Sequence, residues 1–207
     1  LFARASNLVS GLGREALQLQ AKIFEQLVLG QLHETIGPVD QEDPVDHYIQ
    51  VLRDKTGSLI ALAAQLGAML SGADSSFQKP LEEFGQSIGV AFQLIDDIID
   101  IESTKSQSGK ISGTDLLAGV PTLPVLLLAK HDDNDSVKLL ADISSGLDAA
   151  SLPEVLERLR AHPVMEESKL ETRRWAEAAI AAIAPLPKGK VRTALEAFAL
   201  AVVERKG

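Results

Sequence analysis

Residues 90–100, VAFQLIDDIID, place three aspartates within an otherwise apolar stretch. Apolar residues recur there at the period of an α-helix, so the spacing predicts a helix over about 80–101. On that helix the polar side chains fall at i, i+3, i+4 and i+7 and form one stripe. The stripe consists of Gln93, Asp96, Asp97 and Asp100. Since the flanking positions are nearly all apolar, we expect it to face a cavity.

Three carboxylates this close repel one another unless a cation lies between them, and burying an uncompensated carboxylate is costly. Hard oxygen ligands without a nearby histidine suit Mg²⁺, which takes further ligands from water and substrate phosphates. The alternative is a solvated acidic face, which the apolar flanks disfavour. The EF-hand pattern and the Glu-x-x-His pattern of di-iron bundles are both absent.

The rest of the chain predicts an all-α fold. Of its 207 residues 45% are hydrophobic and only 4% aromatic, and no convincing period-2 alternation is present. Besides the stripe-bearing helix, the apolar periodicity predicts helices over 13–36, 45–71, 122–131, 135–144, 153–161, 164–184 and 188–204. Without an internal repeat or a clear boundary, residues 1–207 are expected to form a single domain.

Charge and composition exclude several classes of protein. Twenty basic against 29 acidic residues give a net charge of −9, so binding of nucleic acid through a broad basic face is not expected. The absence of cysteine excludes disulfides and thiolate metal sites. Neither a secretion signal nor a transmembrane segment is visible, and we expect a cytoplasmic protein.

Two lysines supply counter-charges for an anionic ligand. Lys55 and Thr56 precede an apolar run, and Gly109-Lys110 follows the aspartates in a polar segment. A lysine is a compact point charge that can meet a diphosphate, and a neighbouring glycine lets the backbone approach an anion. Each lysine alone reads as a surface residue. Together with the aspartates they indicate a site for Mg²⁺ and a diphosphate.

Three segments in this order resemble the trans-isoprenyl diphosphate synthases, or polyprenyl synthetases, of the bacterial medium- and long-chain type. They are KTGSL at 55–59, GVAFQLIDDIIDI at 89–101 and GKISGTDLLAGVPTLP at 109–124. The FQxxDDxxD block resembles that family's second aspartate-rich motif. The resemblance implies a helical bundle of the isoprenoid-synthase type around a central cavity.

The resemblance also implies roles for individual side chains. It implies that the Mg²⁺ ligands are Asp96, Asp97 and Asp100. It implies catalytic side chains, beside the allylic diphosphate or the allylic cation, at Lys55, Thr56, Gln93 and Lys110. It implies substrate-binding side chains at Gln31, Glu34, Asp115 and Arg205.

The activity that the resemblance implies is Mg²⁺-dependent prenyl transfer. Isopentenyl diphosphate would be condensed with geranyl, farnesyl or geranylgeranyl diphosphate to a longer trans-polyprenyl diphosphate, for a quinone side chain, by a homodimer. One alternative is a non-catalytic helical partner of a prenyl synthase. Another is a terpene cyclase on the same fold, which the KT and GKxxGTDL elements disfavour.

The sequence departs from the family pattern in two places. The first aspartate-rich motif is absent, because HDDND at 131–135 has the wrong spacing and reads as a solvated helix start. We expect that motif before Leu1, so that the chain holds the C-terminal two-thirds of the family's domain. Val120 also stands where the family commonly has a lysine.

Overall fold

The structure is a computed structural model that describes residues 2–103 and 112–205. Within these ranges the regular secondary structure is entirely helical, which confirms the predicted all-α class. None of the described helices is long and apolar enough to cross a membrane.

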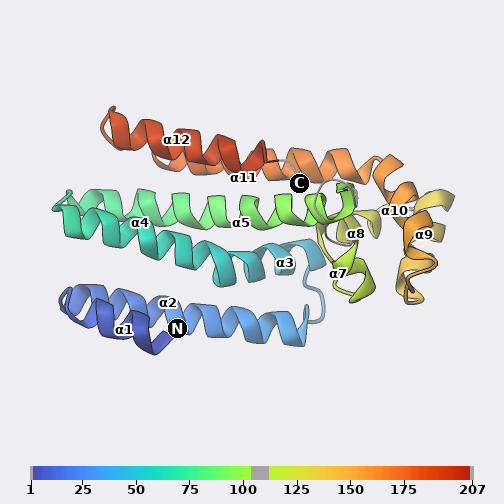
Figure 1. The fold of residues 1–207 in the computed structure, drawn as a ribbon, viewed down its shortest axis with the longest axis horizontal. Helices are drawn as coiled ribbons and strands as arrows, with labels where there is room; N and C mark the ends of the chain where they lie inside the picture. The colour runs from blue at the N-terminus through green and yellow to red at the C-terminus, as the bar shows by residue number, and fades with distance from the viewer. Residues whose placement is uncertain (1, 104–111, 206–207) are drawn as a thin grey trace. The chain divides into compact units, whose positions relative to one another are not determined.

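The helices follow the predicted ranges closely (Figure 1). In the first half they are α1 (Phe2–Ser10), α2 (Arg14–Ile36), α3 (Pro44–Leu52), η1 (Arg53–Gly57), α4 (Ser58–Ser71), η2 (Ser75–Phe77) and α5 (Gln78–Glu102). The second half holds α7 (Thr114–Leu117), α8 (Leu123–Leu128), α9 (Asn134–Ser144), α10 (Leu152–Ala161), α11 (Val164–Ala182) and α12 (Lys190–Val203). The structure adds α1, η2 and α7, and it interrupts the predicted helix over 45–71 with η1, one turn of π-helix.

The chain divides into two compact units. Unit 1 comprises residues 1–91 and 175–202, and unit 2 comprises residues 92–174 and 203–207. The single domain over residues 1–207 stays a prediction.

In unit 1, α4 and the first part of α5 approach each other through glycines. A Cβ atom built on Gly85 would lie 2.3 Å from the Cα atom of Ala61, and one on Gly89 would lie 2.4 Å from the Cα atom of Gly57. Real Cβ atoms do not come this close to backbone. The two helices therefore pack backbone against backbone, beside the fully buried Phe84.

Unit 2 packs the apolar face of the second part of α5 against the short helices that follow. Its fully buried side chains include Leu94, Ile98, Ile101, Leu123, Leu128, Leu139, Leu159 and Met165. Because this face of α5 is buried, the stripe of polar residues points to a different side of the helix.

The helix start predicted at HDDND is confirmed. Asp133 precedes α9, and its carboxylate accepts hydrogen bonds from the backbone N–H groups of Asp135 and Ser136, both at 3.0 Å. These are donors that the first turn of a helix leaves without an intrahelical partner. The segment is a capped helix terminus and not a displaced metal motif.

Candidate functional site

A cavity of about 330 Å³ in unit 2 is lined by the polar stripe of α5. The stripe residues in its wall are Gln93, Asp96, Asp97 and Asp100. Thr114, Asp115 and Arg205 also line it. Six of the predicted site residues thus share one cavity, although only the first four are neighbours in the sequence.

Asp100 joins the end of α5 to the segment that carries Asp115. Its carbonyl oxygen accepts a hydrogen bond from the N–H of Gly113 at 2.9 Å. Its carboxylate accepts one from the hydroxyl of Thr114 at 3.0 Å and one from the N–H of Asp115 at 3.2 Å. Gly113 has a φ of +76°, which favours glycine at this turn. The carboxylate of Asp100 is thereby oriented from both backbone and side chain.

The carboxyl group of Asp115 interacts electrostatically with the carboxylate of Asp100. Burial, and then the negative charge of Asp100, raise the pKa of the Asp115 carboxyl above its ordinary value. Both causes disfavour a second negative charge here. A divalent cation would relieve the repulsion between the two carboxylates.

Asp96 is paired with the C-terminal arginine of unit 2. The Nη2 atom of Arg205 lies 2.8 Å from Oδ1 of Asp96, and the guanidinium lies over the ring of Phe92 at 5.1 Å from its centroid. Asp97 has a different partner: it is buried, and its carboxylate accepts a hydrogen bond from the N–H of Leu123 at 3.4 Å, at the start of α8. The two adjacent aspartates therefore have different surroundings.

The cavity offers a suitable set of donors but no assembled cluster. Within residues 2–103 and 112–205, no group of three or more Asp, Glu or His side chains converges as a metal site. The cavity carboxylates are held instead by Arg205, Thr114 and backbone N–H groups. The carboxylate oxygens of these residues and the hydroxyl of Thr114 are hard ligands, which fit a cation that keeps several waters and binds together with phosphate.

Unit 1 brings together three of the other predicted residues. The ammonium of Lys55 lies 2.5 Å from Oε2 of Glu34, and the side-chain amide of Gln31 donates to the same oxygen at 2.8 Å. Lys55 and Thr56 both lie in the π-helical turn η1. Single π-helical turns within α-helices occur frequently at functional sites.

A buried aspartate that the sequence analysis did not single out anchors this turn. Asp54 accepts hydrogen bonds from the side-chain amides of Gln26 at 2.7 Å and Gln50 at 3.0 Å. Gly30 of α2 lies against it so closely that a Cβ atom there would be 2.6 Å from Cβ of Asp54. In the sequence Asp54 reads as an ordinary surface acid, because its amide partners come from other turns and another helix.

The remaining predicted residues are placed as follows. Lys110 lies outside the described residues. Val120, the departure from the family pattern, is exposed. The roles of the predicted site residues stay predictions.

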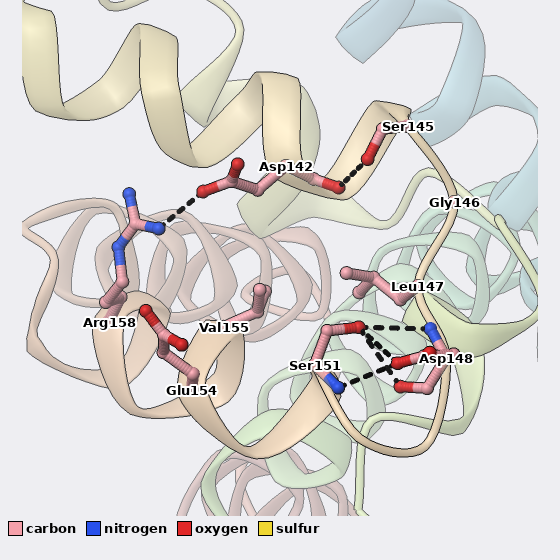
Figure 2. A pocket seen from close by; sticks show the side chains of 9 residues that line it. All are labelled: Asp142, Ser145, Gly146, Leu147, Asp148, Ser151, Glu154, Val155 and Arg158. Atoms are coloured by element: carbon pink, nitrogen blue, oxygen red, sulfur yellow. Dashed lines mark hydrogen bonds and ion pairs between the residues drawn. The ribbon is translucent and has the colours of Figure 1, made fainter.

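A second cavity of unit 2, about 430 Å³, lies between the end of α9 and α10 (Figure 2). Three of its charged side chains are bound within the chain. Arg158 lies 2.5 Å from a carboxylate oxygen of Asp142, and Asp148 accepts hydrogen bonds from the backbone N–H and the hydroxyl of Ser151. These contacts close the turn between the two helices, so we do not place this cavity in the candidate site.

Residues 1–159 match the model of a family described as polyprenyl synthetase, and the chain therefore belongs to the polyprenyl synthetase family. The fold expected from the resemblance is confirmed by a solved relative. A crystal structure of geranylgeranyl pyrophosphate synthase from Corynebacterium glutamicum, complexed with calcium and isoprenyl diphosphate, superposes with a TM-score of 0.88 at 39% identity. The match covers 99% of this chain and 64% of that one.

Two curated relatives agree with this assignment. The chain is 41% identical to a nonaprenyl diphosphate synthase of Mycobacterium tuberculosis, over 100% of this chain and 62% of that protein. It is 32% identical to heptaprenyl diphosphate synthase component 2 of Bacillus subtilis, over 93% of this chain and 55% of that protein. The chain thus spans less than two thirds of the length of these relatives.

Proposed function

We propose that the protein acts in Mg²⁺-dependent trans-prenyl transfer, condensing isopentenyl diphosphate with an allylic diphosphate to a longer polyprenyl diphosphate. The observation that carries this proposal is the cavity of unit 2, in whose wall lie all three aspartates of the FQxxDDxxD block. The names of the relatives, which are prenyl diphosphate synthases, support the same reaction class.

In this reaction the allylic C–O bond breaks, diphosphate leaves, and the allylic cation forms a new C–C bond with the double bond of isopentenyl diphosphate. A proton then leaves the adduct. The protein must bind the leaving diphosphate and need not supply a nucleophile. Bound Mg²⁺ would neutralise charge on the diphosphate as the bond breaks.

The described residues suit these tasks. Asp96 and Asp100 would hold the cation with their carboxylate oxygens, and Asp97 would fix the wall through its bond to the start of α8. Lys55 would bind the diphosphate, with Glu34 and Gln31 orienting its ammonium group. Gln93 and Thr56 would face the allylic cation with neutral polar groups. Arg205 would turn from Asp96 to the substrate once the cation binds.

The proposal also covers the length of the product, the oligomeric state and the cellular location. The name of the Mycobacterium tuberculosis relative favours a long-chain product of the kind found in quinone side chains. We expect a homodimer in the cytoplasm. Exposed apolar side chains on α2, among them Val28 and Leu32, are a surface that association would cover.

The deciding experiment incubates the full-length protein with Mg²⁺, isopentenyl diphosphate and each of geranyl, farnesyl and geranylgeranyl diphosphate. Products are separated and weighed by mass spectrometry. Asp96→Ala is expected to lower turnover at least about a hundredfold. The matched control is Asp132→Ala, an exposed aspartate outside the cavity, which should retain activity. Near-normal turnover by Asp96→Ala would overturn the site assignment.

The same experiment separates the other candidates. A non-catalytic partner of a prenyl synthase is the second candidate, because one relative, from Bacillus subtilis, is named as one component of a synthase. It would show no elongation by the protein alone. A terpene cyclase would release a hydrocarbon or alcohol instead of a longer diphosphate.

A further inference from the structure

Arg160 of α10 is bound to the carboxyl end of α5 without lining the cavity. Its Nε atom donates to the carbonyl oxygen of Ile101 at 2.7 Å, and its Nη2 atom donates to that of Ser103 at 2.9 Å. These carbonyls belong to the first and the third residue after Asp100. Arg160 is 59 residues away from Ile101 in the sequence.

These two hydrogen bonds satisfy carbonyl groups at the carboxyl end of α5. The last carbonyls of a helix have no intrahelical donors, and the carboxyl end carries partial negative charge. The planar guanidinium of Arg160 pairs with these carbonyls and neutralises the partial charge, since it presents several donors in a fixed geometry together with a positive charge. The hydroxyl of Ser112 donates to the same carbonyl of Ser103. Arg160 and Ser112 thus both bind the carbonyl oxygen of Ser103, which follows the end of α5.

These contacts bear on the direction of the Asp100 side chain. On one side of Asp100, Arg160 fixes the backbone at Ile101 and Ser103. On the other, Gly113 binds its carbonyl, and Asp115 binds its carboxylate through a backbone N–H. A change in the path of residues 101–103 would shift Asp100 relative to Asp115, so that their oxygens no longer face one cavity in the same way.

We propose that Arg160 is a positioning residue of the candidate site, which holds Asp100 and Asp115 in the arrangement that binds a divalent cation with a diphosphate. This inference rests on the proposed function. The family match ends at residue 159, so it assigns Arg160 no role. The position follows only from the two hydrogen bonds and from what they join.

The test measures cation binding directly in the full-length protein. Mn²⁺ is titrated in the presence of inorganic pyrophosphate and followed by electron paramagnetic resonance. Arg160→Ala is expected to weaken Mn²⁺ binding about tenfold, the lower end of the loss on removing an outer-shell partner. Arg160→Lys should recover part of it, because an ammonium can reach one carbonyl. Arg158→Ala is the matched control, since Arg158 lies on the same helix but pairs with Asp142.

A second measurement distinguishes positioning from a general loss of stability. Amide hydrogen exchange at Gly113 and Asp115, whose N–H groups bind Asp100, should accelerate in Arg160→Ala and stay unchanged in Arg158→Ala. Wild-type Mn²⁺ affinity in Arg160→Ala would overturn the proposal, even with a lower melting temperature. If that variant does not fold, Arg160→Lys decides: wild-type affinity overturns the proposal and weakened affinity supports it.

The same measurements distinguish a failure of the positioning role from a failure of the proposed function. A wild-type protein that binds no Mn²⁺ with pyrophosphate would contradict the metal site itself. The exchange rates of Gly113 and Asp115 in Arg160→Ala would then decide the positioning role alone: unchanged rates overturn it, and accelerated rates support it.

Discussion

Arg205 lies on Asp96, the first aspartate of the block, with 2.8 Å between Nη2 and Oδ1. The guanidinium is held there by a second contact, with the ring of Phe92. Arg205, two residues before Gly207, therefore neutralises a carboxylate that we propose as a ligand of the cation. Cation binding at Asp96 must compete with this ion pair.

The competition predicts opposite effects for one substitution under two conditions. Arg205→Gln frees Asp96, so Mn²⁺ alone should bind more tightly, by up to about fivefold, since an exposed ion pair contributes up to about 1 kcal/mol. With pyrophosphate present the same variant should bind the complex more weakly, because a positive charge near the phosphates is lost. Calorimetric titrations with and without pyrophosphate measure both effects.

Arg205→Lys is the control for this pair, because it keeps the charge but not the planar group. It should remain close to the wild type in Mn²⁺ binding. Equal Mn²⁺ affinity in Arg205→Gln and the wild type would contradict competition at Asp96.

Lys55 gives a prediction for unit 1. Its ammonium is directed by Glu34 and lies in a turn that Asp54 anchors from within. Lys55→Met should weaken binding of Mg²⁺-pyrophosphate by about ten- to a hundredfold, the range that corresponds to loss of a charged hydrogen bond. Lys79→Met is the control, since Lys79 pairs with surface glutamates of α5. Equal losses of affinity in the two variants would show that Lys55 acts only through the net charge of the protein and does not contact the pyrophosphate.

The close packing of α4 and α5 gives a prediction about stability. Gly85→Ala should lower the free energy of unfolding by about 1–3 kcal/mol or more, because its methyl group would meet the backbone of Ala61. Gly67, on the exposed side of α4, has nothing within 4 Å of the corresponding atom. Gly67→Ala should stabilise by about 0.5–1 kcal/mol through helix propensity. Urea denaturation of both variants checks the sign, and two variants of equal stability would contradict the close approach.

The sequence predicted the helices and the polar stripe because both depend on local periodicity. The spacing of Gln93 and Asp100 alone indicates that they share one face, and the apolar flanks indicate that this face meets a cavity. The capped start of α9 also followed from local residues, since Asp133 binds N–H groups within three positions.

What the sequence could not predict are contacts between distant segments. Arg160 reaches carbonyls 59 and 57 positions earlier, and an arginine near a helix end is ordinarily a surface residue. Asp54, in the π-helical turn that also holds Lys55, is bound by Gln26, which lies 28 positions earlier on another helix. Such contacts are decided by packing, which hydrophobic periodicity does not encode.

The cap of α9 gives a prediction about pH. Hydrogen bonds from the hydroxyl and N–H of Ser136 and from the N–H of Asp135 lower the pKa of the Asp133 carboxyl to about 2, from an ordinary value of 3.8. A carboxyl whose pKa is lowered in the folded state stabilises the fold above the unfolded value, and that contribution disappears as the pH falls through the folded value.

Asp133→Asn should therefore destabilise the protein most above pH 3.8, and the difference from the wild type should shrink between 3.8 and about 2 as the wild-type carboxyl takes up its proton. Asparagine can still cap the helix, so the charge is the main thing removed. Urea denaturation at a series of pH values measures the difference. Asp132→Asn, which removes a neighbouring carboxylate and leaves the cap in place, is the matched control. A difference that stays constant from neutral pH to 2 would show that the carboxylate charge at Asp133 does not stabilise the start of α9.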